Sequence, residues 1–365
     1  MDCCFSYFKP KFPTLPVGSI RGPIAFQNRF NRRPLPIVAS SRCQFGGLAA
    51  PLEPRTPTGR FLSGMLLDGR DGFQAAARKE LQRLAAERDE AATRLQLSIG
   101  SDEACLHRRI AECKKHECQE AVEDVIYTLI LHKFSEIRVH LVPKLSECLY
   151  NGRLEIWPSK DWELESIHSC EVLQMVRDHI TAAVGQRADA NVTASWATAE
   201  VHRSHLCKLY ASSIFYGYLL KSIAFRHYLE RDLDVSSSYL GFGTWTQVSE
   251  MFSIGSKQIA YNMGPTGFSS GARLPCDLGK NVGNLRIYMM GFDVEMIGMC
   301  ANPRFKESVS LVGRHSRALF GDEEADVIKT SFASVKRFLL EAVAFGSFLW
   351  DVETRVNSEY VLEED

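Results

Sequence analysis

The sequence predicts a mainly α-helical protein with a helical bundle-like architecture, composed of two related helical halves. Long stretches place apolar residues at alternating spacings of three and four, which is the period of an amphipathic helix. Two of these stretches, 205–224 and 334–353, match at an offset of 129 residues. Strand patterns are scarce, so at most a short β-hairpin is expected near 137–157. A chain of 365 residues that is 45% hydrophobic and 24% charged can bury a sizeable core.

The first 42 residues have the composition of an organelle transit peptide. Residues 1–52 hold seven Lys and Arg against one acid, a charge of +6, which leaves −7 for the remainder. Prolines and arginines interrupt every apolar run, and no amphipathic helix of the mitochondrial kind is visible. We therefore expect a chloroplast transit peptide over 1–42, cleaved within 37–43. The alternative is a basic arm that is retained and binds polyanions.

Eleven cysteines are scattered along the chain, and those that follow the expected transit peptide are singly placed. This distribution is typical of thiols in a reducing compartment and unlike a disulfide framework. It fits a location in the chloroplast stroma.

The first half is expected over 71–234, after a linker at 43–70 that Pro and Gly punctuate. A charged helix over 71–99 ends at Gly100, and Ser101 begins a second helix that runs to about Lys133. The Asn-Gly turn in "LYNGRLEIW" marks the possible hairpin. Further helices follow over 160–183 and about 196–233.

Residues 235–282 are rich in Ser, Gly and Pro, and we interpret them as a flexible connection. The second half is expected over 283–357, with a helix over 304–320 and a final helix over 327–355. An acidic tail, 358–365, completes the chain.

The two matching stretches predict an internal duplication. The apolar stripe of the later stretch coincides at every position with apolar, aromatic or small residues of the earlier one. Gly346 falls on Gly217, with a small residue four positions before each glycine. We expect both glycines to be packing positions where another backbone approaches closely. The alternative is two unrelated amphipathic helices.

Neither stretch is expected to span a membrane or to form a cofactor pocket. Their longest uncharged runs are 12 and 9 residues, at 209–220 and 342–350, where a bilayer requires about 20. A cofactor pocket would need converging polar ligands, which the stripes lack. The stripes are therefore interpreted as the core-facing sides of two helices.

Three longer motifs resemble a known family. They are "CLHRRIAECKKHECQEAVEDVIYTLI", "LVPKLSECLYNGRLEIWPSKDWELESIHS" and "LLEAVAFGSFLWDVE". Together they resemble the plant plastid domain-of-unknown-function 760 family over about residues 60–353. The resemblance implies a chloroplast protein with a transit peptide, linked to UV-B or other stress responses, and a client of the stromal Clp chaperone–protease. It implies no catalytic residues.

One group of residues is a weak candidate for metal or thiol chemistry. Cys105, Cys113 and His116, which we call the thiol cluster, fall roughly on one helical face. A zinc site needs a fourth ligand, and no second Cys/His pair lies at ligand spacing nearby. The spacing therefore favours a solvated helix face.

Other motifs are weaker still. "GFSSG" places Ser269 in the nucleophile position, but prolines on both sides disrupt the strand–turn–helix context that the motif needs. The lone Glu165-x-x-His168 lacks the second copy that a di-iron bundle requires. No phosphate-binding loop is present, and the charge of −7 disfavours nucleic-acid binding.

The sequence thus predicts a non-catalytic stromal protein of regulatory or interaction type, with an unidentified protein partner. It calls for no cofactor, metal or membrane span. The alternative is a metal- or thiol-dependent enzyme that uses the thiol cluster of Cys105, Cys113 and His116.

Overall fold

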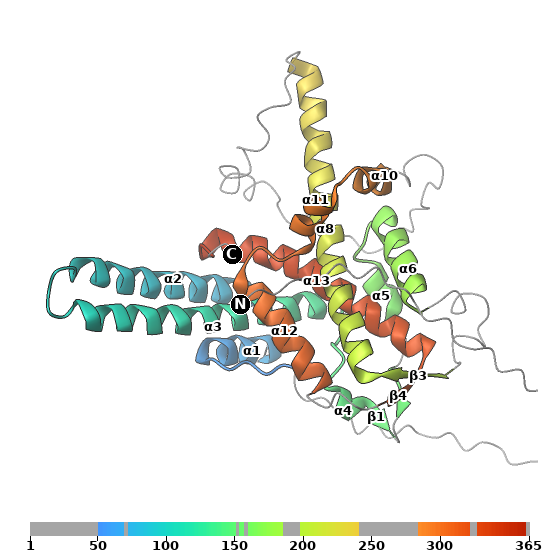
Figure 1. The fold of residues 1–365 in the computed structure, drawn as a ribbon, viewed down its shortest axis with the longest axis horizontal. Helices are drawn as coiled ribbons and strands as arrows, with labels where there is room; N and C mark the ends of the chain where they lie inside the picture. The colour runs from blue at the N-terminus through green and yellow to red at the C-terminus, as the bar shows by residue number, and fades with distance from the viewer. Residues whose placement is uncertain are drawn as a thin grey trace, which may run out of the picture. The chain divides into compact units, whose positions relative to one another are not determined.

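The computed structural model describes residues 50–68, 72–150, 153–156, 160–184, 198–240, 284–321 and 327–362. All of them belong to one compact unit, Phe45–Asp365. The described part is mainly α-helical, as predicted (Figure 1). The predicted transit peptide at 1–42 lies outside the described residues.

Helices α2 (Phe73–Leu97) and α3 (Ala104–Glu136) form a long hairpin (Figure 1). The turn between them uses Gly100, whose positive φ of 88° favours glycine. The first part of α3 is largely exposed, whereas almost every residue from Cys118 to Phe134 is buried. The end of the hairpin that carries the turn is therefore the exposed end.

Helix α1 (Pro57–Asp68) lies inside the predicted 43–70 linker, so that part of the prediction is corrected. Its start is held by Asp124 of α3, whose Oδ2 accepts hydrogen bonds of 2.8 Å from the backbone N–H groups of Arg55 and Thr56. This carboxylate holds the two residues before the helix, whereas the helix itself is capped locally, because Thr56 Oγ1 accepts a 3.1 Å hydrogen bond from the N–H of Gly59. Thr56 as N-cap followed by Pro57 is a local helix-start signal, which the prediction of a linker overlooked.

The segment after α3 holds α4 (Leu145–Cys148), β1 (Leu149–Tyr150), β2 (Arg153–Leu154), α5 (Asp161–Glu165) and α6 (Cys170–Val184). The predicted hairpin is present, since β1 pairs antiparallel with β2. The single helix expected over 160–183 is instead divided into α5 and α6. Ser169 starts the second of these, because its Oγ accepts a hydrogen bond of 3.4 Å from the N–H of Val172.

Two further strands were not predicted. β3 (Thr198–His202) runs directly into α8 (Arg203–Leu240), and β4 (Val327–Ser331) runs directly into α13 (Phe332–Glu359). The sheet order is β1-β2-β4-β3, with β4 parallel to β2 and antiparallel to β3. The helices expected over about 196–233 and 327–355 include these strand residues. The expectation of at most one hairpin is therefore corrected to a four-stranded sheet.

The strands and long helices repeat at the predicted offset. Thr198 and Val327 begin the strands, and Arg203 and Phe332 begin the helices; each pair is 129 residues apart. The antiparallel register places Glu200 opposite Lys329. Lys329 is also the residue that corresponds to Glu200 in the repeat, 129 positions later. Equivalent strands that pair in this way are related by a local two-fold axis.

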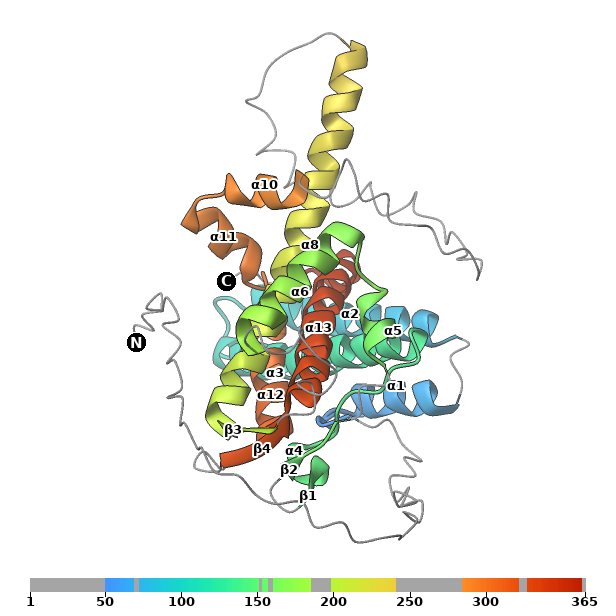
Figure 2. The same ribbon diagram turned by 90° about the vertical axis from the view of Figure 1, so that its right-hand side faces the viewer.

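The long helices α8 and α13 cross at the two glycines. A Cβ atom on Gly217 would overlap the main chain of Val343, and one on Gly346 would overlap that of Ile214. Val343 and Ile214 are themselves counterparts 129 residues apart. The close approach is thus reciprocal, as the two-fold relation requires (Figure 2 shows α8 and α13 side by side).

Helices α10 (Asn284–Met290), α11 (Val294–Ala301) and α12 (Lys306–Phe320) complete the described fold. Helix α12 packs against both α3 and α8. The predicted connection at 235–282 begins too early, because α8 continues to Leu240; the rest of that segment lies outside the described residues. Among the helices that are described, none combines the length and apolar character needed to cross a bilayer.

Candidate functional site

The α3 thiol cluster is not drawn together by the fold. Cys105 and Cys113 are both exposed, and eight residues of helix separate them by about 12 Å. His116 lies 4.0 Å from Glu120, with 72% of its side chain exposed. Within the described ranges, no three His, Cys, Asp or Glu side chains are grouped closely enough to hold a metal ion.

Cys118, four turns along α3 from Cys105, is enclosed instead. Its Sγ lies 3.7 Å from the carbonyl oxygen of Leu84 in α2, and the side chain is buried. Burial raises the pKa of this thiol. Because the thiolate is the reactive form, Cys118 is poorly suited to nucleophilic or redox chemistry.

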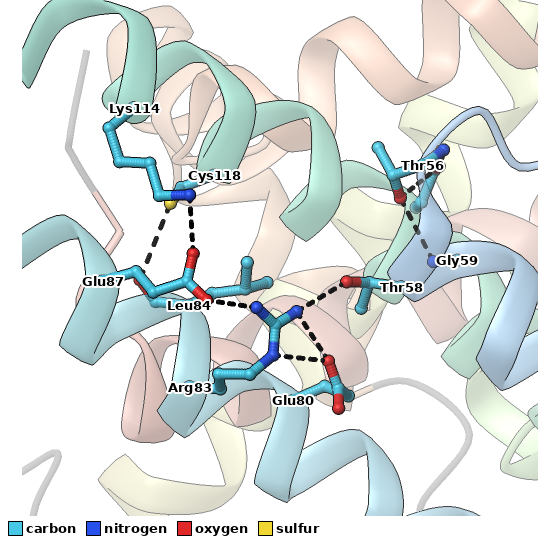
Figure 3. A network of polar contacts seen from close by, with 10 residues as sticks. Thr56, Thr58, Gly59, Glu80, Arg83, Leu84, Glu87, Lys114 and Cys118 are labelled. Carbon is cyan, nitrogen blue, oxygen red and sulfur yellow. Dashed lines mark hydrogen bonds and ion pairs between the residues drawn. The ribbon is translucent and has the colours of Figure 1, made fainter. Parts of the chain in front are cut away.

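A network of polar contacts beside Cys118 joins the first three helices (Figure 3). The Arg83 guanidinium of α2 donates to Glu80, to Glu87 and to Thr58 of α1. Lys114 of α3 lies 2.7 Å from Glu87, and its hydrogen bond lowers the pKa of that carboxyl. Partly exposed pairs of this kind contribute about 0–1 kcal/mol each. The network therefore aligns the helices and offers no reactive group.

The lone Glu165-x-x-His168 motif is also structural. Glu165 accepts a 2.7 Å hydrogen bond from Arg177 and lies 3.5 Å from Lys336. Burial lowers the pKa of His168 to about 4, so it is neutral at physiological pH. A carboxylate neutralised by two cations is a poor ligand for a di-iron centre. Ser269 lies outside the described residues.

A cluster of buried charges lies where α12 packs against α3. Arg314 of α12 donates to Glu123 at 2.6 Å and to Asp124 at 3.2 Å. All three side chains are at most 8% exposed. Removing one partner from such a buried group leaves an uncompensated charge, which costs about 3–5 kcal/mol.

A second buried group joins α8, α12 and α13. Tyr210 Oη and His315 Nε2 lie 3.0 Å apart, and Glu341 pairs with Arg337 at 3.0 Å. The Glu341 carboxylate also accepts a 3.1 Å hydrogen bond from the N–H of Val142. Burial raises the pKa of Tyr210, and the nearby Glu341 raises it further.

Burial controls the protonation of this group as well. It raises the pKa of Glu341 against the opposing effect of Arg337, and it lowers the pKa of His315 to about 3. His315 is therefore a neutral imidazole, and one proton lies in the hydrogen bond between its Nε2 and the Tyr210 hydroxyl. His315, Tyr210 and Glu341 have no exposed surface.

His315 has a counterpart in the other copy of the repeat. Helices α6 and α12 both contain 15 residues, and His179 occupies in α6 the position that His315 occupies in α12. His179 stacks on Tyr216 with ring centroids 4.2 Å apart, and His315 stacks on Phe345 at 4.5 Å. Tyr216 and Phe345 are 129 residues apart. The duplication thus includes a short helix, a strand and a long helix.

Sequence reasoning missed the buried polar groups because their partners are 105 and 191 residues apart in the chain. One signal was present: Glu341 interrupts an otherwise apolar stretch of α13, and a carboxylate at such a position needs buried partners. The buried group of Tyr210, His315 and Glu341 can keep its protons at fixed positions. Its enclosure, however, gives a substrate no direct contact with these side chains.

The exposed end of the α2–α3 hairpin carries apolar side chains among exposed charged residues such as Asp102, Glu103 and Arg109. Leu97 is 82% exposed, Ile99 75%, Leu106 60% and Ile110 43%. We call these four residues the hairpin tip. They come from the last residue of α2, the turn and the first two turns of α3. Apolar side chains that gather at an exposed end mark candidate contact surfaces.

Comparison with known proteins identifies the family. A family model described as "Protein of unknown function (DUF760)" matches residues 105–233. A UV-B-induced chloroplastic protein of Arabidopsis thaliana is 33% identical over 330 residues, which cover 85% of this chain and 77% of the relative. The chain belongs to the DUF760 family. The predicted resemblance is therefore confirmed.

The match to the DUF760 model begins in α3 and ends in α8, so it contains the first copy of the repeat. The chloroplastic relative supports the predicted chloroplast location. No solved structure matches this DUF760 chain.

Proposed function

We propose that the protein acts in the chloroplast stroma by binding a protein partner through the hairpin tip, without catalysis of its own. Its setting would be the response to UV-B or another stress. The observation that carries the proposal is the exposure of Leu97, Ile99 and Leu106, each 60% or more, at one end of the molecule's longest hairpin.

The titratable groups favour binding over catalysis. Arg314 and Arg337 are paired with buried carboxylates, His315 is hydrogen-bonded to Tyr210 inside the core, and the cysteines of the α3 thiol cluster are separated along the helix. A catalytic site requires an acid or base within hydrogen-bond reach of a bound substrate. The enclosed positions of Tyr210, His315 and Glu341 do not meet that requirement.

The chloroplast location is supported by the relative, whose name describes it as chloroplastic and UV-B-induced. The stroma is favoured because the cysteines are scattered as free thiols. The family resemblance adds a role as a client of the stromal Clp chaperone–protease. That role predicts slower turnover of the protein in plastids depleted of Clp.

Site-specific crosslinking tests the binding surface. A photoreactive residue at Ile99 should form a discrete adduct in stromal extract, and the double variant Leu97→Glu/Leu106→Glu should abolish it. Leu67 of α1, which is 54% exposed, supplies the matched position for a control crosslinker and a Leu67→Glu control. Equal adducts at Ile99 and Leu67, or an adduct that survives the double variant, would refute the proposal.

A further inference from the structure

The chain that precedes α1 packs into the core. We call residues 50–56 the N-terminal strap. Leu52 of the strap is only 8% exposed, and its backbone N–H donates a 3.4 Å hydrogen bond to the hydroxyl oxygen of Tyr127. Tyr127 belongs to the buried part of α3 and has no exposed surface. The strap therefore contacts the protein interior before the first helix begins.

The other end of the strap is held by Asp124, which precedes Tyr127 by one turn of α3. Asp124 Oδ2 accepts hydrogen bonds of 2.8 Å from the N–H groups of Arg55 and Thr56, and one of 2.9 Å from the Thr56 hydroxyl. The Thr56 hydroxyl in turn accepts from the N–H of Gly59 (Figure 3). A Cβ atom on Gly59 would lie 2.7 Å from the Cβ of Asp124. The strap and the first turn of α1 thus fit closely around one buried carboxylate.

The same carboxylate also holds α12. Its second oxygen, Oδ1, accepts a 3.2 Å hydrogen bond from Arg314 of α12, which also donates to Glu123 at 2.6 Å. Tyr127 has a neighbour in α12 as well, since its ring centroid lies 5.8 Å from that of His315. Asp124 and Tyr127 therefore each contact both the strap and α12.

Withdrawal of the strap would change the surroundings of Asp124. Its Oδ2 would lose the hydrogen bonds that fix the orientation of the carboxylate. Glu123 and Asp124 would then repel each other beside the single cation of Arg314, and water entering from the open side would weaken their attraction to it. The strength of the contact between α3 and α12 therefore depends on whether the strap is in place.

We infer that the N-terminal strap is a latch for the second copy of the repeat, because Asp124 and Tyr127 couple its docking to the packing of α12. Such coupling is reciprocal, so each of the two contacts stabilises the other. Opening the latch would loosen α12 without any contact to α12 itself, which provides a means of regulating the second copy from the start of the folded chain. The crossing of α8 and α13 is held by main-chain contacts at Gly217 and Gly346, and it should persist when the latch opens.

Amide hydrogen exchange of the mature protein, followed by mass spectrometry, tests the latch. Thr56→Val removes the hydroxyl that donates to Asp124 and leaves every side chain of α3 and α12 unchanged. Exchange should accelerate about tenfold in the strap and the first turn of α1, as loss of a hydrogen bond to a charged group predicts, and about threefold in α12. The matched control is Thr93→Val in α2, where the hydroxyl donates to the carbonyl oxygen of Asp89 on the exposed surface. It should change exchange in neither segment.

Arg314→Met tests the coupling from the other side. It removes the ion pair with Oδ1, and the strap should exchange faster although the substitution lies in α12. If this variant does not fold, the result for Thr56→Val decides alone. Faster exchange of the strap in Thr56→Val with α12 unchanged would overturn the latch. Equal acceleration throughout the chain, including the α8–α13 crossing, would also overturn it, because that result indicates general destabilisation.

Discussion

Replacing either crossing glycine by alanine should destabilise the protein strongly. The added Cβ on Gly217 would lie 2.7 Å from the carbonyl carbon of Val343, and that on Gly346 would lie 2.8 Å from the carbonyl carbon of Ile214. Both distances are shorter than real Cβ atoms show, and the atoms they meet belong to the main chain. A side chain could rotate away, but here the helices themselves must separate.

Two effects of opposite sign determine the magnitude. Alanine is favoured over glycine within a helix by about 1 kcal/mol. Overpacking a tight contact costs about 1–3 kcal/mol, occasionally more. Because the clash involves backbone on both helices, the cost should lie at or above the upper end, and we expect a net loss of about 2 kcal/mol for each alanine. Leucine at either position should be worse.

Chemical denaturation of the mature protein measures this loss. Gly313 in the middle of α12 is the matched control, since nothing lies within 4 Å of a Cβ built there. Gly313→Ala should therefore raise the free energy of unfolding by about 1 kcal/mol. If Gly217→Ala or Gly346→Ala were neutral or stabilising, that glycine would not be at a close crossing, and the reciprocal packing would be wrong.

Three other predictions concern the whole chain. Burial lowers the pKa of His179 to about 4 and of His315 to about 3. Below about pH 6.5 the unfolded state therefore binds more protons than the folded state. As pH falls from 6.5 to 4, each histidine should lower the free energy of unfolding by up to about 1.4 kcal/mol per pH unit. The raised pKa of Glu341 acts in the opposite direction, and a flat denaturation profile from pH 6.5 to 4 would contradict the histidine assignment. Elemental analysis should find no stoichiometric transition metal, because the α3 thiol cluster is spread along its helix; a full equivalent of zinc or iron would support the enzyme alternative. Limited proteolysis should cut first within 255–282, where Gly, Ser and Pro are frequent, and leave fragments that remain together on gel filtration; separation would show that the α8–α13 contact does not hold the halves.

The duplication could be read from the sequence because it depends on short-range periodicity. A helical stripe repeats every three or four residues, and one glycine in the same place fixes the offset. The offset of 129 derived from Gly217 and Gly346 also aligns β3 with β4. The strands themselves were missed because each has only five residues and continues into a helix without a Gly or Pro between them. A strand of that length has too few alternations to be distinguished from the first turn of a helix.

The buried polar groups could not be located in the same way. A hydrogen bond between Tyr210 and His315 depends on how α8 packs against α12, and no local pattern encodes that distance. The error at 43–70 has a different cause, since Thr56, whose Oγ1 accepts a hydrogen bond from the N–H of Gly59, is a local N-cap followed by Pro57 and was overlooked. Local sequence thus predicts which face of a helix is apolar, while the partners of isolated polar residues follow from the packing.

The local two-fold relation explains why the apolar helix stripes and the buried polar groups occur together. Two equivalent strand–helix units bury their apolar stripes against each other, and glycine at each crossing allows the backbones to touch. The histidine sites of α6 and α12 are equivalent in stacking, yet His179 meets the Ser213 hydroxyl at 2.9 Å whereas His315 meets Tyr210. The second site is fully enclosed because α3 covers α12 and supplies Glu123 and Asp124 to Arg314. The two copies have therefore diverged where α3 packs against only one of them, so a change at Arg314 should disturb the second copy while the crossing at the glycines persists.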